Sequence, residues 1–111
     1  MTKDWTRVCA VSDIQPLGAR TLPTPKGEIA VFRCSDDSVF AVINRCPHRQ
    51  GPLSEGIVHG HRVTCPLHAW VIDLENGEAV APDIGCAPKI PVRVIDDAVW
   101  IELALVDSGG D

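Results

Sequence analysis

The sequence lacks a basic run, a long apolar run and any extended stretch of helix-forming residues. Fifteen acidic residues against ten basic ones give a formal charge of -5, so the counterion release that drives nucleic-acid binding has little to act on. No apolar run approaches the ~20 residues that span a bilayer, and the charged segment Met1–Arg7 does not fit a signal peptide. We therefore expect a cytoplasmic protein with neither nucleic acid nor membrane as a partner.

The scarcity of helix-forming runs is accompanied by frequent Val and Ile and by nine Gly and nine Pro. This composition favours short strands joined by turns. A chain of 111 residues can build one compact domain with its own core and is too short for two. We predict a single all-β domain over residues 1–111.

Apolar runs with strand-like character lie on both sides of a central segment. They are Trp5–Val11, Ile29–Phe32, Val39–Ile43, Ala69–Leu74, Ala79–Val80, Ile90–Ile95 and Val99–Val106. Between them, residues 46–68 carry a Gly or Pro every few positions, so regular structure is expected to give way to loops. The sequence thus predicts a base of antiparallel sheets from residues 1–43 and 76–111, with a loop-rich insert at residues 44–75.

The cysteines point to a metal. Five is an odd number, and in a reducing cytosol cysteines serve as metal ligands or buried thiols rather than as a disulfide framework. Cys46 and His48 form a C-x-H motif, and after sixteen residues Cys65 and His68 form a C-x-x-H motif. Two thiolates and two imidazoles suit zinc or an iron–sulfur centre. Zinc fingers usually group Cys with Cys and His with His, so the interleaved order favours two irons, and a structural zinc module is the alternative.

All four positions resemble the ligand pattern of the Rieske family. The resemblance implies a Rieske-type all-β fold and one [2Fe-2S] cluster per chain, with Cys46 and Cys65 on one iron and His48 and His68 on the other. With neutral imidazoles such a cluster is neutral when oxidised and singly negative when reduced, so it accepts an electron more readily than a four-cysteine cluster. We expect both histidines at an exposed tip, from which electrons leave.

The positions around these ligands indicate a low potential. High-potential Rieske proteins carry a disulfide beside the cluster and hydroxyl donors to its sulfurs. Here the matching positions hold Gly51 and Leu67 in place of the disulfide, and Trp70 and Ile72 in place of the hydroxyls. Because the added electron is then less stabilised, we expect a potential in the lower half of the Rieske range of about -150 to +300 mV. Such a potential is typical of a ferredoxin-like donor.

Residues 45–60 and 63–74 resemble one subfamily, the small subunit of assimilatory NAD(P)H-dependent nitrite reductase, and the likeness continues through residues 82–86 and 91–94. The resemblance implies a large partner subunit that carries flavin, siroheme and a [4Fe-4S] cluster and reduces nitrite to ammonium in nitrate assimilation. This chain has no nucleotide, flavin or siroheme motif, so we expect it to relay electrons within that assembly or to stabilise it. The competing interpretation is a free Rieske ferredoxin that serves a ring-hydroxylating dioxygenase.

The other cysteines and histidines have simpler interpretations. We expect Cys9, Cys34 and Cys86 to be small buried apolar residues. Cys86 fits this least well, because its loop resembles the proline-containing loop that covers the cluster in the family. His59 and His61 are expected in a solvated turn between the two motifs.

Arg45 and Arg49 lie beside the ligands and are either docking contacts for an acidic partner or solvated charges. The tryptophans, Trp5, Trp70 and Trp100, are expected to pack the insert onto the base.

Overall fold

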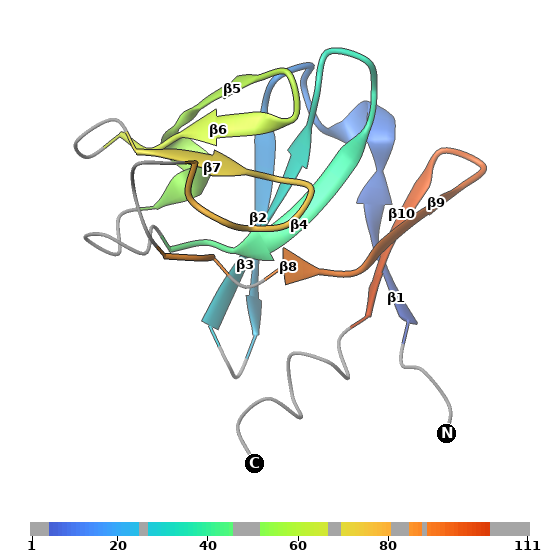
Figure 1. Cartoon of the computed structure of the whole chain (residues 1–111). Helices are drawn as coiled ribbons and strands as arrows, with labels where there is room; N and C mark the ends of the chain where they lie inside the picture. The colour runs from blue at the N-terminus through green and yellow to red at the C-terminus, as the bar shows by residue number, and fades with distance from the viewer. Residues whose placement is uncertain are drawn as a thin grey trace.

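The computed structural model describes residues 5–24, 27–45, 52–66, 70–80, 85–87 and 89–102. Within these ranges the chain forms ten strands and two short 3-10 helices, and the paired strands are antiparallel (Figure 1). In chain order the elements are β1 (Trp5–Ala10), η1 (Val11–Asp13), β2 (Ala19–Thr24), β3 (Gly27–Arg33), β4 (Val39–Ile43), η2 (Leu53–Glu55), β5 (Ile57–His59), β6 (Arg62–Thr64), β7 (Val71–Asp73), β8 (Lys89–Ile90), β9 (Val92–Ile95) and β10 (Ala98–Glu102). The expectation of an all-β fold is confirmed.

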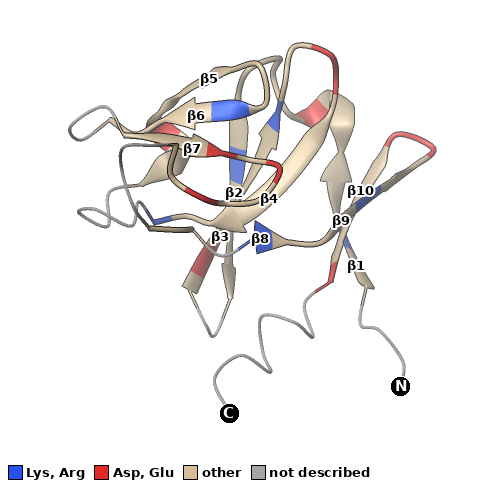
Figure 2. Ribbon diagram, in the orientation of Figure 1, with Lys and Arg blue, Asp and Glu red and all other residues tan. Residues whose placement is uncertain are grey.

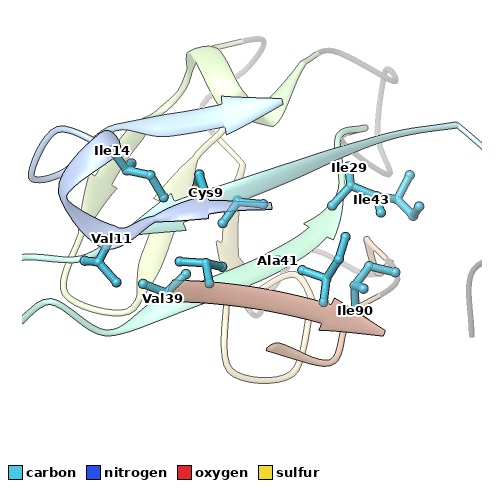
Figure 3. Packing of buried hydrophobic residues seen from close by; sticks show 11 residues of the cluster. Cys9, Val11, Ile14, Ile29, Val39, Ala41, Ile43 and Ile90 are labelled. Carbon is cyan, nitrogen blue, oxygen red and sulfur yellow. The ribbon is translucent and has the colours of Figure 1, made fainter. Parts of the chain in front are cut away.

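The strands form three sheets, with the orders β1-β10-β9, β2-β3-β4-β8 and β5-β6-β7. Two separate apolar clusters fill the space between them. One lies between the first two sheets, and Figure 3 shows part of it, with Cys9, Ile29, Ala41 and Ile90 converging from β1, β3, β4 and β8. The other lies between the second and third sheets. The four-stranded sheet is therefore the middle layer of the molecule.

The middle strand β3 explains this layering. Ile29 and Val31 belong to the first cluster, whereas Ala30 and Phe32 belong to the second. All four are fully buried. Because successive side chains of a strand point to opposite faces, an unbroken apolar run produces a strand that is buried on both sides.

Two turns between neighbouring strands show why these residues form them. Asp96 and Asp97 both have positive φ, 50° and 66°, and they join β9 to β10 in the tight hairpin that such backbone angles permit. In the turn between β3 and β4, Asp36 Oδ1 accepts the Ser38 amide at 3.0 Å. Acidic side chains that bond to nearby amides are typical of turns.

The structure corrects the prediction for the central segment. Residues 46–68 were expected to be loops, yet β5 and β6 lie inside them and pair with β7 as a small sheet. The sequence prediction also missed β2, which contains Pro23 and has only exposed and partly buried positions. Proline is tolerated in β2 because this strand lies at the edge of its sheet.

The prediction for two tryptophans was also wrong. Trp5 and Trp100 lie on the outer three-stranded sheet, where they and Ile95 line a hollow of about 200 Å³. The Arg93 guanidinium lies 4.4 Å from the centre of the Trp5 ring. Trp70, in contrast, packs against the second cluster, which joins the insert to β3, and its predicted role is confirmed.

Charged residues are spread over the surface. Figure 2 shows basic positions on β2, β6, β8 and β9, separated from one another, and acidic positions mainly in turns. Within the described ranges, no helix has the length and apolar character needed to cross a membrane.

Candidate metal centre

Cys65 directly follows β6, and its side chain is only 2% exposed. Its backbone N–H donates to the Trp70 carbonyl at 2.6 Å, just beyond the register pair Thr64 and Val71. These contacts hold the two ends of segment 65–70 together at the end of the β6–β7 hairpin. The C-x-x-H motif thus begins at a fixed, buried position.

Cys65 is the one predicted ligand that the structure describes; Cys46, His48 and His68 lie outside the described residues, as do Gly51 and Leu67. Around Cys65 the second cluster supplies apolar side chains, among them Leu53, Val63 and Ile72. Ile72 is fully buried. A buried apolar side chain therefore occupies the position that, by the resemblance described above, carries a hydroxyl donor in high-potential proteins. The surroundings of this thiol exclude water.

His61 lies in the turn between β5 and β6, as predicted, and its ring also pairs with two acidic side chains from other parts of the chain. Its Nδ1 lies 2.8 Å from Glu75 Oε2 and its Nε2 lies 2.9 Å from Asp36 Oδ2, while its ring centre is 5.0 Å from that of Phe40. The hydrogen bond to Asp36, followed by that to Glu75, raises the pKa of His61. The same bond lowers the pKa of Asp36 to about 2.

Sequence reasoning missed this arrangement because its members are far apart in the chain. Asp36 lies in the β3–β4 turn and Glu75 follows β7, so no local motif indicates that both reach His61. His59 is exposed, with its Nε2 2.7 Å from Thr64 Oγ1. Among the described residues, no three His, Cys, Asp or Glu side chains are grouped so as to hold a metal ion.

The cysteines outside the motifs divide into two kinds. Cys9 and Cys34 are buried, as predicted, whereas Cys86 is exposed, contrary to prediction. Burial raises the pKa of Cys9. It also raises the pKa of Cys34 to about 11, with further contributions from Asp36 and Glu75. Thiols of this kind are unreactive near neutral pH. Arg45 is exposed, and Arg49 lies outside the described residues.

Comparison with known proteins adds the family. The sequence model of the Rieske [2Fe-2S] domain matches residues 4–91. The ferredoxin subunit of anthranilate 1,2-dioxygenase from Burkholderia cepacia is 40% identical over 81 residues, and the match covers 68% of this chain and 69% of that protein. The oxygenase component of dicamba O-demethylase from Stenotrophomonas maltophilia is 33% identical over 105 residues, 86% of this chain. The chain spans only 30% of that oxygenase component.

A solved structure is similar over nearly its whole length. It is described as a proposed small subunit of an NADH-dependent nitrite reductase from Mycobacterium tuberculosis, and it is 26% identical to this chain. The two superpose with a TM-score of 0.80, covering 91% of this chain and 96% of that one.

The domain of this family binds one [2Fe-2S] cluster, and the surroundings of Cys65 fit such a group. A thiolate buried among apolar side chains is costly unless its charge is neutralised, and metal ions supply that neutralisation. Cys65 is held by a backbone hydrogen bond at the start of a hairpin turn, as a rigid ligand requires.

Proposed function

The chain belongs to the Rieske [2Fe-2S] domain family, and from this premise we propose that it is the electron-transferring small subunit of an assimilatory NAD(P)H-dependent nitrite reductase. The observation that carries the proposal is the superposition on a proposed nitrite reductase small subunit over 91% of this chain and 96% of the other. The resemblance of residues 45–60 and 63–74 to that subfamily supports the same conclusion.

The proposed ligands are Cys46, His48, Cys65 and His68, in an insert at residues 44–75 on a base of residues 1–43 and 76–111. When bound, the cluster accepts and donates one electron at a time. The protein's task is to hold the ligands rigidly and to keep water from the sulfur side. Cys65 contributes through its burial, and β3 contributes by joining the insert to the base.

The proposed partner is a large subunit with flavin, siroheme and a [4Fe-4S] cluster, which takes electrons from NADH or NADPH. Nitrite reduction to ammonium needs six electrons, so a carrier of single electrons must turn over repeatedly. The exposed Arg45 is a candidate for the docking surface.

The test is NAD(P)H-dependent nitrite reduction by the large subunit with and without this chain. Stimulation by the chain supports the proposal, and a rate that is independent of it contradicts the proposal. Cys46→Ser distinguishes relay from assembly, because only a relay needs the cluster. Cys86→Ser is the matched control, since this cysteine is exposed and lies outside the ligand motifs.

A second candidate function rests on a separate observation, the 40% identity to an anthranilate 1,2-dioxygenase ferredoxin subunit. A free ferredoxin would shuttle electrons from a reductase to a ring-hydroxylating oxygenase. Turnover of such an oxygenase that depends on this chain, without stimulation of nitrite reduction, would establish this function in place of the first.

A further inference from the structure

The end of β4 carries a buried hydrogen-bonding side chain that the proposed function does not explain. Asn44 follows β4 and is 9% exposed. Its backbone N–H donates to the Glu28 carbonyl at 2.7 Å, and the Arg45 N–H donates to the Ile43 carbonyl at 2.7 Å. The chain direction is therefore fixed just before Cys46.

The Asn44 side chain then reaches across to η2. Its Nδ2 donates to Glu28 Oε1 at 2.7 Å and to Ser54 Oγ at 2.9 Å, and its Oδ1 accepts the Ser54 backbone N–H at 2.7 Å. Both amide hydrogens and the carbonyl oxygen are used. Among the described residues, no buried side-chain nitrogen or oxygen lacks a partner, so this network is fully satisfied, as rigid buried networks are.

Asn44 and Ser54 enclose the segment that carries the first two proposed ligands. Cys46 lies two residues after Asn44, and the chain returns to the described part at Pro52, next to the fully buried Leu53. The two hydrogen bonds between Asn44 and Ser54 therefore hold together the described residues on the two sides of this segment.

The same pair also relates this segment to Cys65. The Gly56 N–H donates to the Leu53 carbonyl at 2.9 Å, and a side chain on Gly56 would collide with the Thr64 carbonyl. The turn of η2 is thus packed directly against β6, which ends at Thr64, just before Cys65. A displacement of Ser54 would change the spacing between the two ligand motifs.

We propose that Asn44 is a positioning residue for the cluster, which acts by pinning both ends of the segment that carries Cys46 and His48. The proposal rests on the ligand assignment given above and does not depend on whether the partner is a nitrite reductase or an oxygenase. Its effect is on cluster geometry and retention, because Asn44 itself is not a ligand.

The first experiment compares Asn44→Ala with Asn76→Ala in the purified holoprotein. Asn76 is the matched control, because it is exposed and its Oδ1 also accepts one backbone N–H, from Glu78 at 2.9 Å. We expect Asn44→Ala to shift the EPR g-values of the reduced cluster and to speed iron release to a chelator by roughly tenfold or more. Asn76→Ala should leave both unchanged. Wild-type g-values and release rate in Asn44→Ala would overturn the proposal.

The second experiment is a rescue, which keeps the test meaningful where Asn44→Ala folds poorly. Asn44→Asp sets a second carboxylate against Glu28 and removes both amide donors, so release should accelerate. Adding Glu28→Gln places an amide donor beside the carboxylate at position 44, so that the donor and the acceptor exchange places. This double variant should return the g-values, the reduction potential and the release rate toward wild type. A double variant no better than Asn44→Asp would refute the proposal.

The ligand assignment is tested separately by Cys46→Ser. Loss of the Rieske EPR signal in that variant supports the assignment on which Asn44 depends, and its retention contradicts the assignment. None of these measurements uses nitrite reduction, so failure of the proposed function leaves their outcome unaffected.

Discussion

Leu53 offers a test of how the second apolar cluster supports the metal site. Its side chain is fully buried in that cluster, which also contains Cys65. Leu53→Ala should lower the free energy of unfolding by about 2–5 kcal/mol, since the removed atoms leave a cavity. With an unfolding entropy of about 2.1 cal/mol/K per residue, 111 residues convert this loss into a fall in the thermal midpoint of about 9–22 °C.

The control is Ile101→Ala, which removes a fully buried side chain from the first cluster. Its fall in thermal midpoint should be in the same range. The two variants should differ in cluster retention, because only Leu53 shares an apolar cluster with Cys65.

The assay follows visible absorbance of the holoprotein in the presence of a chelator, well below both thermal midpoints, with far-UV circular dichroism in parallel. Bleaching should be faster in Leu53→Ala than in Ile101→Ala. Equal bleaching rates would refute the inference that the second cluster protects the metal site, even if both proteins lose the expected stability.

Three further predictions concern side chains away from the ligands. Because His61 has a raised pKa and Asp36 a lowered one, their pairing stabilises the fold fully between about pH 4 and 6.5. The stabilisation is lost as pH rises through the pKa of folded His61 or falls toward the Asp36 pKa of about 2. The thermal midpoints of wild type and His61→Gln should therefore converge at alkaline pH, and a difference that stays constant with pH would contradict this. Iodoacetamide should label Cys86, which is exposed, and spare Cys34 until the protein unfolds, as peptide mapping can check; early labelling of Cys34 would show that the chain opens readily just after β3. Leu17 has a φ of 64° and is 47% exposed, so Leu17→Gly should relieve strain and raise stability by up to about 1 kcal/mol, seen as a higher thermal midpoint; an unchanged or lower midpoint would argue against the strain.

The strands that the sequence predicted well are those formed by one continuous apolar run with turn-forming residues beside it. Val39–Ile43 is β4 residue for residue, and the turn at Asp96–Asp97 joins β9 to β10, because an apolar run between turn-forming residues is a local signal. β5 and β6 have three residues each, which is too short for a hydrophobic period to emerge between glycines. Their pairing depends on tertiary contacts, which local propensity does not predict.

The candidate site likewise has one part that the sequence predicted and one part that it did not. The Cys and His motifs could be recognised from the sequence because the ligands in each motif are close together in the chain. The hydrogen bonds of the Asn44 side chain could not be predicted, because Glu28 lies sixteen residues before it and Ser54 ten residues after it. Asparagine before a turn has an ordinary local interpretation as a turn residue, and nothing in the sequence indicates which distant groups it joins.

The two-sided burial of β3 has a consequence for any attempt to treat the insert as an independent unit. Phe32 and Ala30 supply part of the cluster that contains Cys65, and the intervening Val31 supplies part of the base. Removing the base would take away β3 itself, and with it the apolar side chains on which the β5-β6-β7 sheet packs. Because β5, β6 and β7 have only three residues each and share their apolar cluster with β3, residues 44–75 alone should show no ordered β-sheet by circular dichroism, and the cluster should be held only by the whole chain.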